Sequence, residues 1–90
     1  GGGVAEIVGQ KLRALGASRQ VLCVTHLPQV AAQGHSHYRV SKTASEGVTQ
    51  SAVQALEAKQ REEDLPRMLG GVELTREARA AAKRLLADVE

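Results

Sequence analysis

The stretch that decides the fold is VLCVTHLPQV, residues 21–30. Residues 20–25 form an apolar run of strand length, which is typical of a strand covered on both faces in a parallel α/β sheet. The polar pair Thr25 and His26 ends this run, and Pro28 then suits the first turn of a helix, where its missing N–H costs nothing. The sequence therefore predicts a buried strand over 20–25 and a short helix over 27–33.

The Thr25–His26 pair is the main candidate site. In open α/β sheets, ligands bind beyond the C-terminal ends of the strands, where side chains emerge beside helix N-termini. His26 can donate a hydrogen bond to an anionic ligand such as a phosphate, and Thr25 offers a hydroxyl to a phosphate, a metal-bound water or a carboxylate. The alternative is that His26 only satisfies a loop carbonyl at the strand end. Sequence position alone leaves both open.

Helical and strand-like patterns flank this stretch on both sides. Upstream, apolar residues at helical spacing predict a helix over 4–15, followed by Gly16 at its C-terminal end. Downstream, residues 37–42 alternate between polar and apolar, and residues 48–56 can return as their partner after a turn at residues 45–47. These segments predict a half-exposed β-hairpin.

Two helices are expected at the C-terminal side. The charged run 57–64 has helical charge pairings and continues toward Leu69, and Pro66 either kinks this helix or starts a new one. Thr75 can act as the N-cap of the last helix. Its apolar stripe consists of Ala78, Ala81, Ala82, Leu85, Leu86 and Val89.

The order of helix, buried strand, short helix, β-hairpin and two C-terminal helices places the chain in the α/β class. A single buried strand without a second one to pair with is an incomplete sheet. We therefore expect residues 1–90 to be the C-terminal portion of a single larger domain, with no complete domain boundary inside the chain.

Composition and missing motifs limit what the chain can do. The net charge of +2 is too small to argue for nucleic-acid binding, and the absence of any long apolar run or signal sequence favours a cytosolic protein without a membrane partner. Cys23, His26, His35 and His37 can be written as a metal-binding pattern, but Cys23 lies inside the strand pattern, so no metal site is predicted. No G-x-x-x-x-G-K-S/T phosphate loop occurs, so this chain cannot cradle a nucleotide alone.

Four stretches together resemble the C-terminal end of the RecN family, the bacterial DNA double-strand-break repair ATPases related to the SMC proteins. They are GGGVAEIVGQKLRAL, QVLCVTHLPQVAA, RMLGG and TREARAAAKRLL. The resemblance covers essentially the whole chain, and VTHLPQVAA followed at a distance by RMLGG is its most specific part. A general ABC-type ATPase shares only the apolar strand that ends in Thr-His. Pro66 departs from the plain helix that the family has before RMLGG.

The resemblance implies a C-terminal fragment of an ABC/SMC-type P-loop ATPase head, in which two heads sandwich ATP. His26 would be the catalytic switch histidine that approaches the γ-phosphate, and Thr25 would support it on the γ-phosphate side. Gly1, Gly2 and Gly3 would be the end of the D-loop at the head–head interface. The Walker A, signature and Walker B motifs would lie upstream, so the isolated fragment would be inactive and bind no cofactor.

For the intact protein, the resemblance implies ATP and Mg²⁺ as cofactors and a role in DNA double-strand-break repair and recombination. The implied partners are the remainder of the head, a second head and DNA, and the implied location is the bacterial cytoplasm, associated with the nucleoid. The alternative from another class is a small non-enzymatic interaction module that docks through its C-terminal helix. A third interpretation is direct nucleic-acid binding through basic residues of that helix. They are Arg76, Arg79, Lys83 and Arg84.

Overall fold

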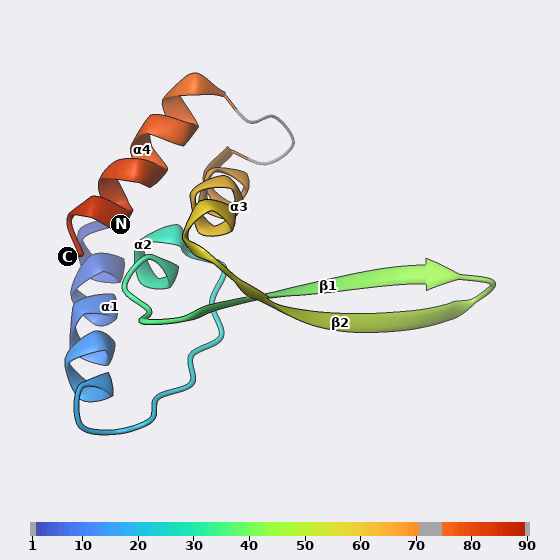
Figure 1. The fold of residues 1–90 in the computed structure, drawn as a ribbon, viewed down its shortest axis with the longest axis horizontal. Helices are drawn as coiled ribbons and strands as arrows, with labels where there is room; N and C mark the ends of the chain where they lie inside the picture. Colours follow the sequence, from blue (N-terminus) through green and yellow to red (C-terminus); the bar gives the residue numbers. More distant parts are fainter. Residues whose placement is uncertain (1, 71–74, 90) are drawn as a thin grey trace.

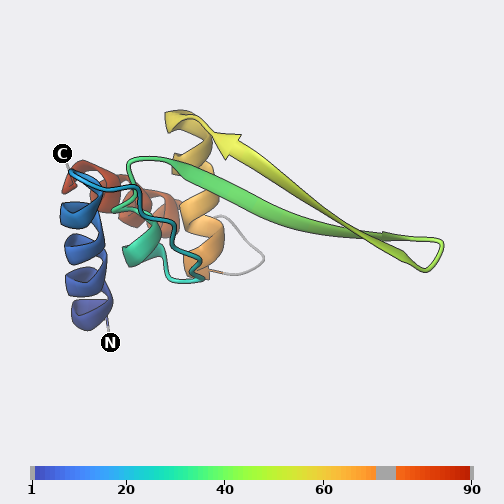
Figure 2. The same cartoon turned by 90° about the horizontal axis from the view of Figure 1, so that it is seen from below.

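A computed structural model describes residues 2–70 and 75–89. Its elements in chain order are α1 (Gly2–Gly16), α2 (Pro28–Ala31), β1 (His37–Ser45), β2 (Val48–Leu56), α3 (Ala58–Gly70) and α4 (Arg76–Ala87). The four helices gather at one end of the molecule, and the β1–β2 hairpin projects away from them (Figures 1 and 2). None of the described helices has the length and apolarity needed to cross a membrane.

The first helix confirms the prediction for residues 4–15, but its apolar stripe does not face a core. Val4 and Ile7 are exposed, whereas Gly9 is buried against α2. A Cβ atom added at Gly9 would lie 2.8 Å from Gln33 Cγ and 3.2 Å from Val30 Cα. The missing side chain therefore lets α1 and α2 approach closely, and the apolar stripe of α1 is left at the surface.

The hairpin is confirmed: β1 is longer than the alternating segment 37–42, and β2 spans residues 48–56 as predicted. β1 pairs antiparallel with β2, from His37 opposite Leu56 to Ser45 opposite Val48. The turn residues Glu46 and Gly47 have positive φ angles of 52° and 78°, as in the two-residue turns whose twist matches that of paired strands. Most of the ribbon is exposed on both faces, including the apolar side chains of Tyr38 and Val40, so the prediction that the hairpin is only half exposed is wrong.

A small core joins α2, α3 and α4. Ala32, Leu65 and Ala82 are fully buried or nearly so, and Met68, Leu85, Leu86 and Val89 pack around them. Pro66 is also buried and lies inside α3, which continues through it as one helix. The helix α4 begins as predicted, because Ala78 N donates to the Oγ1 of Thr75 at 3.0 Å. The alanine-rich stripe of α4 therefore packs against this core. This does not support the alternative that the chain is an interaction module docking through its C-terminal helix.

The prediction of a buried strand over 20–25 is wrong. Residues 20–25 have no strand assignment, and Leu22 and Val24 are 89% and 92% exposed. The sheet in the described part of the chain contains only β1 and β2. A strand needs a neighbour for its backbone N–H and C=O groups, and no described segment lies beside this run as a partner strand. The fold is therefore a mixture of helices and one antiparallel two-stranded sheet.

Candidate functional site

Thr25 and His26 lie just before α2, at the end of the long loop that leaves α1 (Figure 1). Leu27 N donates a hydrogen bond of 3.0 Å to Thr25 Oγ1, which makes a local turn of the type that Thr side chains favour. The hydroxyl of Thr25 can still donate its own proton. His26 is exposed, and its ring makes no hydrogen bond to other described residues, so the loop-carbonyl alternative is not supported.

The short helix α2 is shorter than predicted, and its two ends are held differently. Pro28 occupies the first turn and is buried. At the other end, the guanidinium of Arg61 donates from Nη2 to the carbonyls of Ala31, Ala32 and Gly34 at 3.1, 3.4 and 3.0 Å. Arg13 Nη1 donates to the carbonyl of Gln33 at 2.8 Å. Two arginines from α3 and α1 therefore fix the C-terminal end of the helix that follows His26.

Sequence reasoning missed these two arginines. Arg13 lies 20 residues from the carbonyl that it binds, Arg61 lies 27 to 30 residues from its three carbonyls, and neither belongs to α2. Lys and Arg in the last turn of a helix are a local signal of C-terminal stabilisation, but α2 has none there. The sequence of α2 therefore gives no sign that distant arginines supply this role.

A second polar cluster joins the base of the hairpin to α3. His37 Nε2 lies 3.3 Å from Asp64 Oδ2, and Arg39 Nη1 lies 3.7 Å from Asp64 Oδ1. Burial lowers the pKa of His37, the charge of Asp64 raises it in part, and Arg61 lowers it further. The neutral ring can donate from Nε2 to Asp64, while the buried Nδ1 finds no partner in the described residues. A histidine on an alternating, half-exposed strand would be expected to face solvent, but His37 is largely buried against α3.

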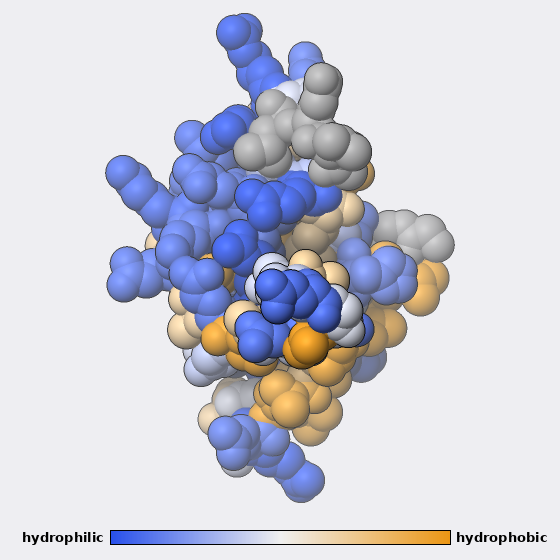
Figure 3. Space-filling view, turned by 90° about the vertical axis from the view of Figure 1, so that its right-hand side faces the viewer, coloured by the Kyte–Doolittle hydropathy of each residue, from blue (hydrophilic) through white to orange (hydrophobic). Residues whose placement is uncertain are grey.

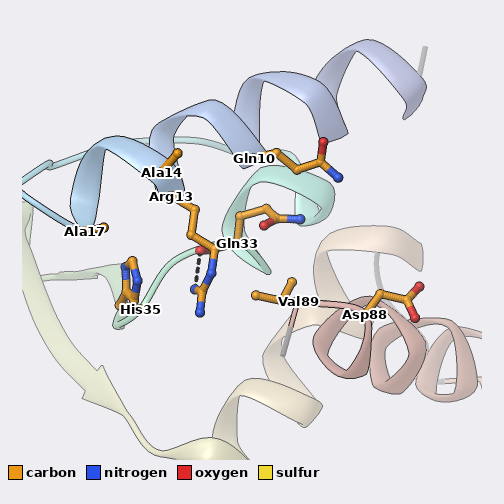
Figure 4. A pocket seen from close by; sticks show the side chains of 8 residues that line it. All are labelled: Gln10, Arg13, Ala14, Ala17, Gln33, His35, Asp88 and Val89. Carbon is orange, nitrogen blue, oxygen red and sulfur yellow. Dashed lines mark hydrogen bonds between the residues drawn. The ribbon is translucent and has the colours of Figure 1, made fainter.

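Two surface hollows lie away from the Thr25–His26 pair. The larger, of about 450 Å³, is lined by residues that include Arg13, Gln33, His35 and Asp88. Figure 4 shows Arg13 reaching from α1 to the Gln33 carbonyl, beside the end of α4. The smaller hollow, of about 290 Å³, is lined in part by His35, His37 and Arg61. Neither lining contains Thr25 or His26, so the candidate pair lies on an open part of the surface.

Of the three N-terminal glycines, the structure describes Gly2 and Gly3. Gly1 lies outside the described residues, and Gly2 and Gly3 belong to the first turn of α1. A Cβ atom at Gly3 would meet nothing within 4 Å. Among residues 2–70 and 75–89, no three His, Cys, Asp or Glu side chains are grouped as metal ligands would be, and Cys23 is exposed.

The chain is similar to DNA repair proteins named RecN from several bacteria. All 90 residues align with the DNA repair protein RecN of Xylella fastidiosa strain 9a5c at 61% identity, and they cover 16% of that protein. RecN of Vibrio cholerae is 48% identical over 85 residues, which are 94% of this chain and 15% of that protein. RecN of Haemophilus influenzae is 45% identical over 85 residues, again 94% of this chain and 15% of that protein. No family model matches the chain.

These matches confirm the resemblance to RecN over the whole chain. The chain spans 16% of the length of the first curated relatives that it matches.

Proposed function

We propose that this chain is the C-terminal portion of the ATP-binding and ATP-hydrolysing head of a RecN-like protein, and that His26 is its switch histidine. The observation that carries the proposal is the 61% identity to a DNA repair protein RecN over every residue of the chain. The intact protein would act in DNA double-strand-break repair and recombination. It would be located in the cytoplasm, associated with the nucleoid. Its partners would be a second head and DNA.

The bare apolar run before His26 supports a place in a larger sheet. Leu22 and Val24 are almost wholly exposed, although a run of this composition favours a strand that is covered on both faces. Neighbouring strands from other parts of a longer protein would bury both side chains. The same strands would place Thr25 and His26 at the C-terminal edge of the sheet, where ligands bind in open α/β folds.

The proposed chemistry is positioning and electrostatic stabilisation at the γ-phosphate of ATP. An exposed imidazole can orient the attacking water or donate a hydrogen bond to an oxygen on which negative charge develops. Thr25, whose oxygen already accepts from Leu27 N, has one proton left to donate on the same side. The sequence contains no phosphate loop, so other segments of the intact protein would bind the remaining phosphates and Mg²⁺.

The test is the substitution His26→Ala in the full-length protein. Loss of a group that stabilises transition-state charge lowers the turnover number by roughly 10²-fold, and we expect little change in ATP affinity. His35→Ala is the matched control, because His35 is also exposed and lies outside the proposed site. The two quantities are measured by steady-state phosphate release and by equilibrium nucleotide binding.

Two results would count against the proposal. Unchanged turnover in His26→Ala would remove the role given to this histidine. ATP hydrolysis by the isolated 90-residue chain at the rate of the full-length protein would show that the missing nucleotide-binding motifs are not needed, and would overturn the assignment to part of a head.

A further inference from the structure

The carbonyl of the last residue of α2 and those of the three residues that follow it have an unusual set of donors. A helix leaves its last carbonyls without partners inside the helix, and α2 has only 4 residues, too few to be stable by itself. Arg61 donates to the carbonyls of Ala31, Ala32 and Gly34, and Arg13 donates to that of Gln33. We call these two side chains and their four carbonyls the arginine clamp.

The charges around Arg13 and Arg61 indicate that both side chains are held by the end of α2. Neither Arg13 nor Arg61 lies within ion-pair distance of a carboxylate in the part of the chain that the structure describes. Burial, and then the charge of Arg13, lowers the pKa of the Arg61 guanidinium. The two neighbouring cations repel each other. The partial negative charge of the carbonyl oxygens at the end of α2 offsets this repulsion.

The orientation of Arg61 leads to the same conclusion. Its Nε is buried and has no hydrogen-bond partner among the described residues, and an unsatisfied buried donor is unfavourable. Arg61 therefore adopts an orientation that leaves Nε unpaired while Nη2 reaches three carbonyls. The contacts with the end of α2 decide the position of this side chain.

A continuous series of hydrogen bonds runs from Arg61 to the candidate site. Arg61 Nη2 donates to Ala31 O at 3.1 Å, and Ala31 N donates to Leu27 O at 3.0 Å. Leu27 N in turn donates to Thr25 Oγ1 at 3.0 Å. Thr25 precedes His26 in the chain, so a shift of α2 along its axis moves the segment that carries both residues.

We propose that Arg61, assisted by Arg13, is a positioning residue that holds α2 and thereby sets the place of His26. The catalytic part of this proposal rests on the proposed function, whereas the clamp itself is a structural statement. Arg61 touches no reacting atom, so its removal lowers turnover only through His26. This predicts a change in turnover number with little change in KM.

The experiment compares Arg61→Met, Arg61→Lys and Arg67→Met in the full-length protein. Arg67 is the matched control, because it lies on the same helix and is exposed. Arg61→Met is expected to lower the turnover number by roughly 10-fold or more, since it removes several charge-assisted hydrogen bonds. Arg61→Lys keeps the charge and restores part of the rate, and Arg67→Met behaves as the wild type.

A double substitution tests whether Arg61 acts through His26. In the His26→Ala background, Arg61→Met is expected to have no further effect on turnover, because the group that it positions is gone. A full additional loss in that background would overturn the positioning role. Turnover of Arg61→Met equal to wild type, in a protein whose His26→Ala variant is impaired, would overturn it as well.

Hydrogen exchange supplies a readout that does not depend on ATP hydrolysis. Peptides covering residues 25–34 are expected to exchange roughly 10-fold to 100-fold faster in Arg61→Met than in Arg67→Met. If His26→Ala leaves turnover unchanged, the proposed function fails, and faster exchange in these peptides still supports the clamp. Unchanged exchange overturns the clamp in either case. Circular dichroism identifies a variant that has lost its fold, in which case Arg13→Met takes its place.

Discussion

The close contact between α1 and α2 at Gly9 gives the sharpest prediction for stability. Replacing an interior helical glycine by alanine normally stabilises a helix by about 1 kcal/mol. At Gly9 the added Cβ would lie 2.8 Å from Gln33 Cγ and 3.2 Å from both Gln29 O and Val30 Cα. Gln33 is buried, and the other two atoms belong to the backbone of α2.

At Gly9 the steric cost of a Cβ atom opposes the gain in helix propensity. Forcing an extra methyl group into a packed contact costs about 1 to 3 kcal/mol, which exceeds the gain in helix propensity. Gly9→Ala is therefore expected to destabilise the chain by about 1 kcal/mol. Gly3→Ala is the matched control, because a Cβ there meets nothing within 4 Å. It is expected to stabilise α1 by up to about 1 kcal/mol, less where the helix end frays.

The assay is urea unfolding of the 90-residue chain, followed by far-ultraviolet circular dichroism for wild type and both variants in parallel. The midpoints are compared at a common slope, because a midpoint shift without a change in slope reports stability. The expected order is Gly3→Ala, then wild type, then Gly9→Ala. A Gly9→Ala chain as stable as Gly3→Ala would refute the reasoning, since α2 would then not lie against Gly9.

Two further predictions concern the hairpin base and the last helix. The pKa of folded His37 lies below its ordinary value, so the unfolded chain takes up a proton first as the pH falls. The free energy of unfolding should therefore fall as the pH drops from about 6.5 through the folded pKa. His37→Gln should reduce this pH dependence. An equal pH dependence in the wild type and in His37→Gln contradicts the prediction. Thr75→Ala removes the acceptor for Ala78 N and should cost about 1 kcal/mol in urea unfolding, whereas Thr75→Ser should not; equal loss in both would show that the cap bond is not the cause.

The elements that the sequence predicted correctly have local signals. The hairpin follows from alternation and from Glu46 and Gly47 at its turn, where positive φ angles are needed. The start of α4 follows from Thr75, whose hydroxyl accepts from an amide only three residues away. Such features depend on neighbours in the chain, so composition and spacing are enough to find them.

The features that the sequence did not predict depend on distant partners. His37 is nearly buried because Asp64 of α3 lies against it, and Arg61 holds α2 from 30 residues away. The strand predicted over 20–25 is absent because it lacks such partners. Its apolar pattern predicts a strand that is covered on both faces, and no described segment covers either face. The Thr25–His26 pair was proposed from its position after that run and stays a prediction, whereas no residue of α2 or its neighbours in the sequence indicates the arginines that hold α2.

The exposed run of residues 21–24 has a consequence for handling the protein. Its side chains contribute to the apolar surface of the molecule, part of which is visible in Figure 3 beside hydrophilic regions. An uncharged, β-prone segment without proline can pair with the same segment of another molecule. Cys23 lies exposed within it, so such pairing would bring two thiols together and allow an oxidised cross-link. Purification of these 90 residues alone therefore calls for reducing agent and dilute solutions, and a Cys23→Ser variant should delay precipitation.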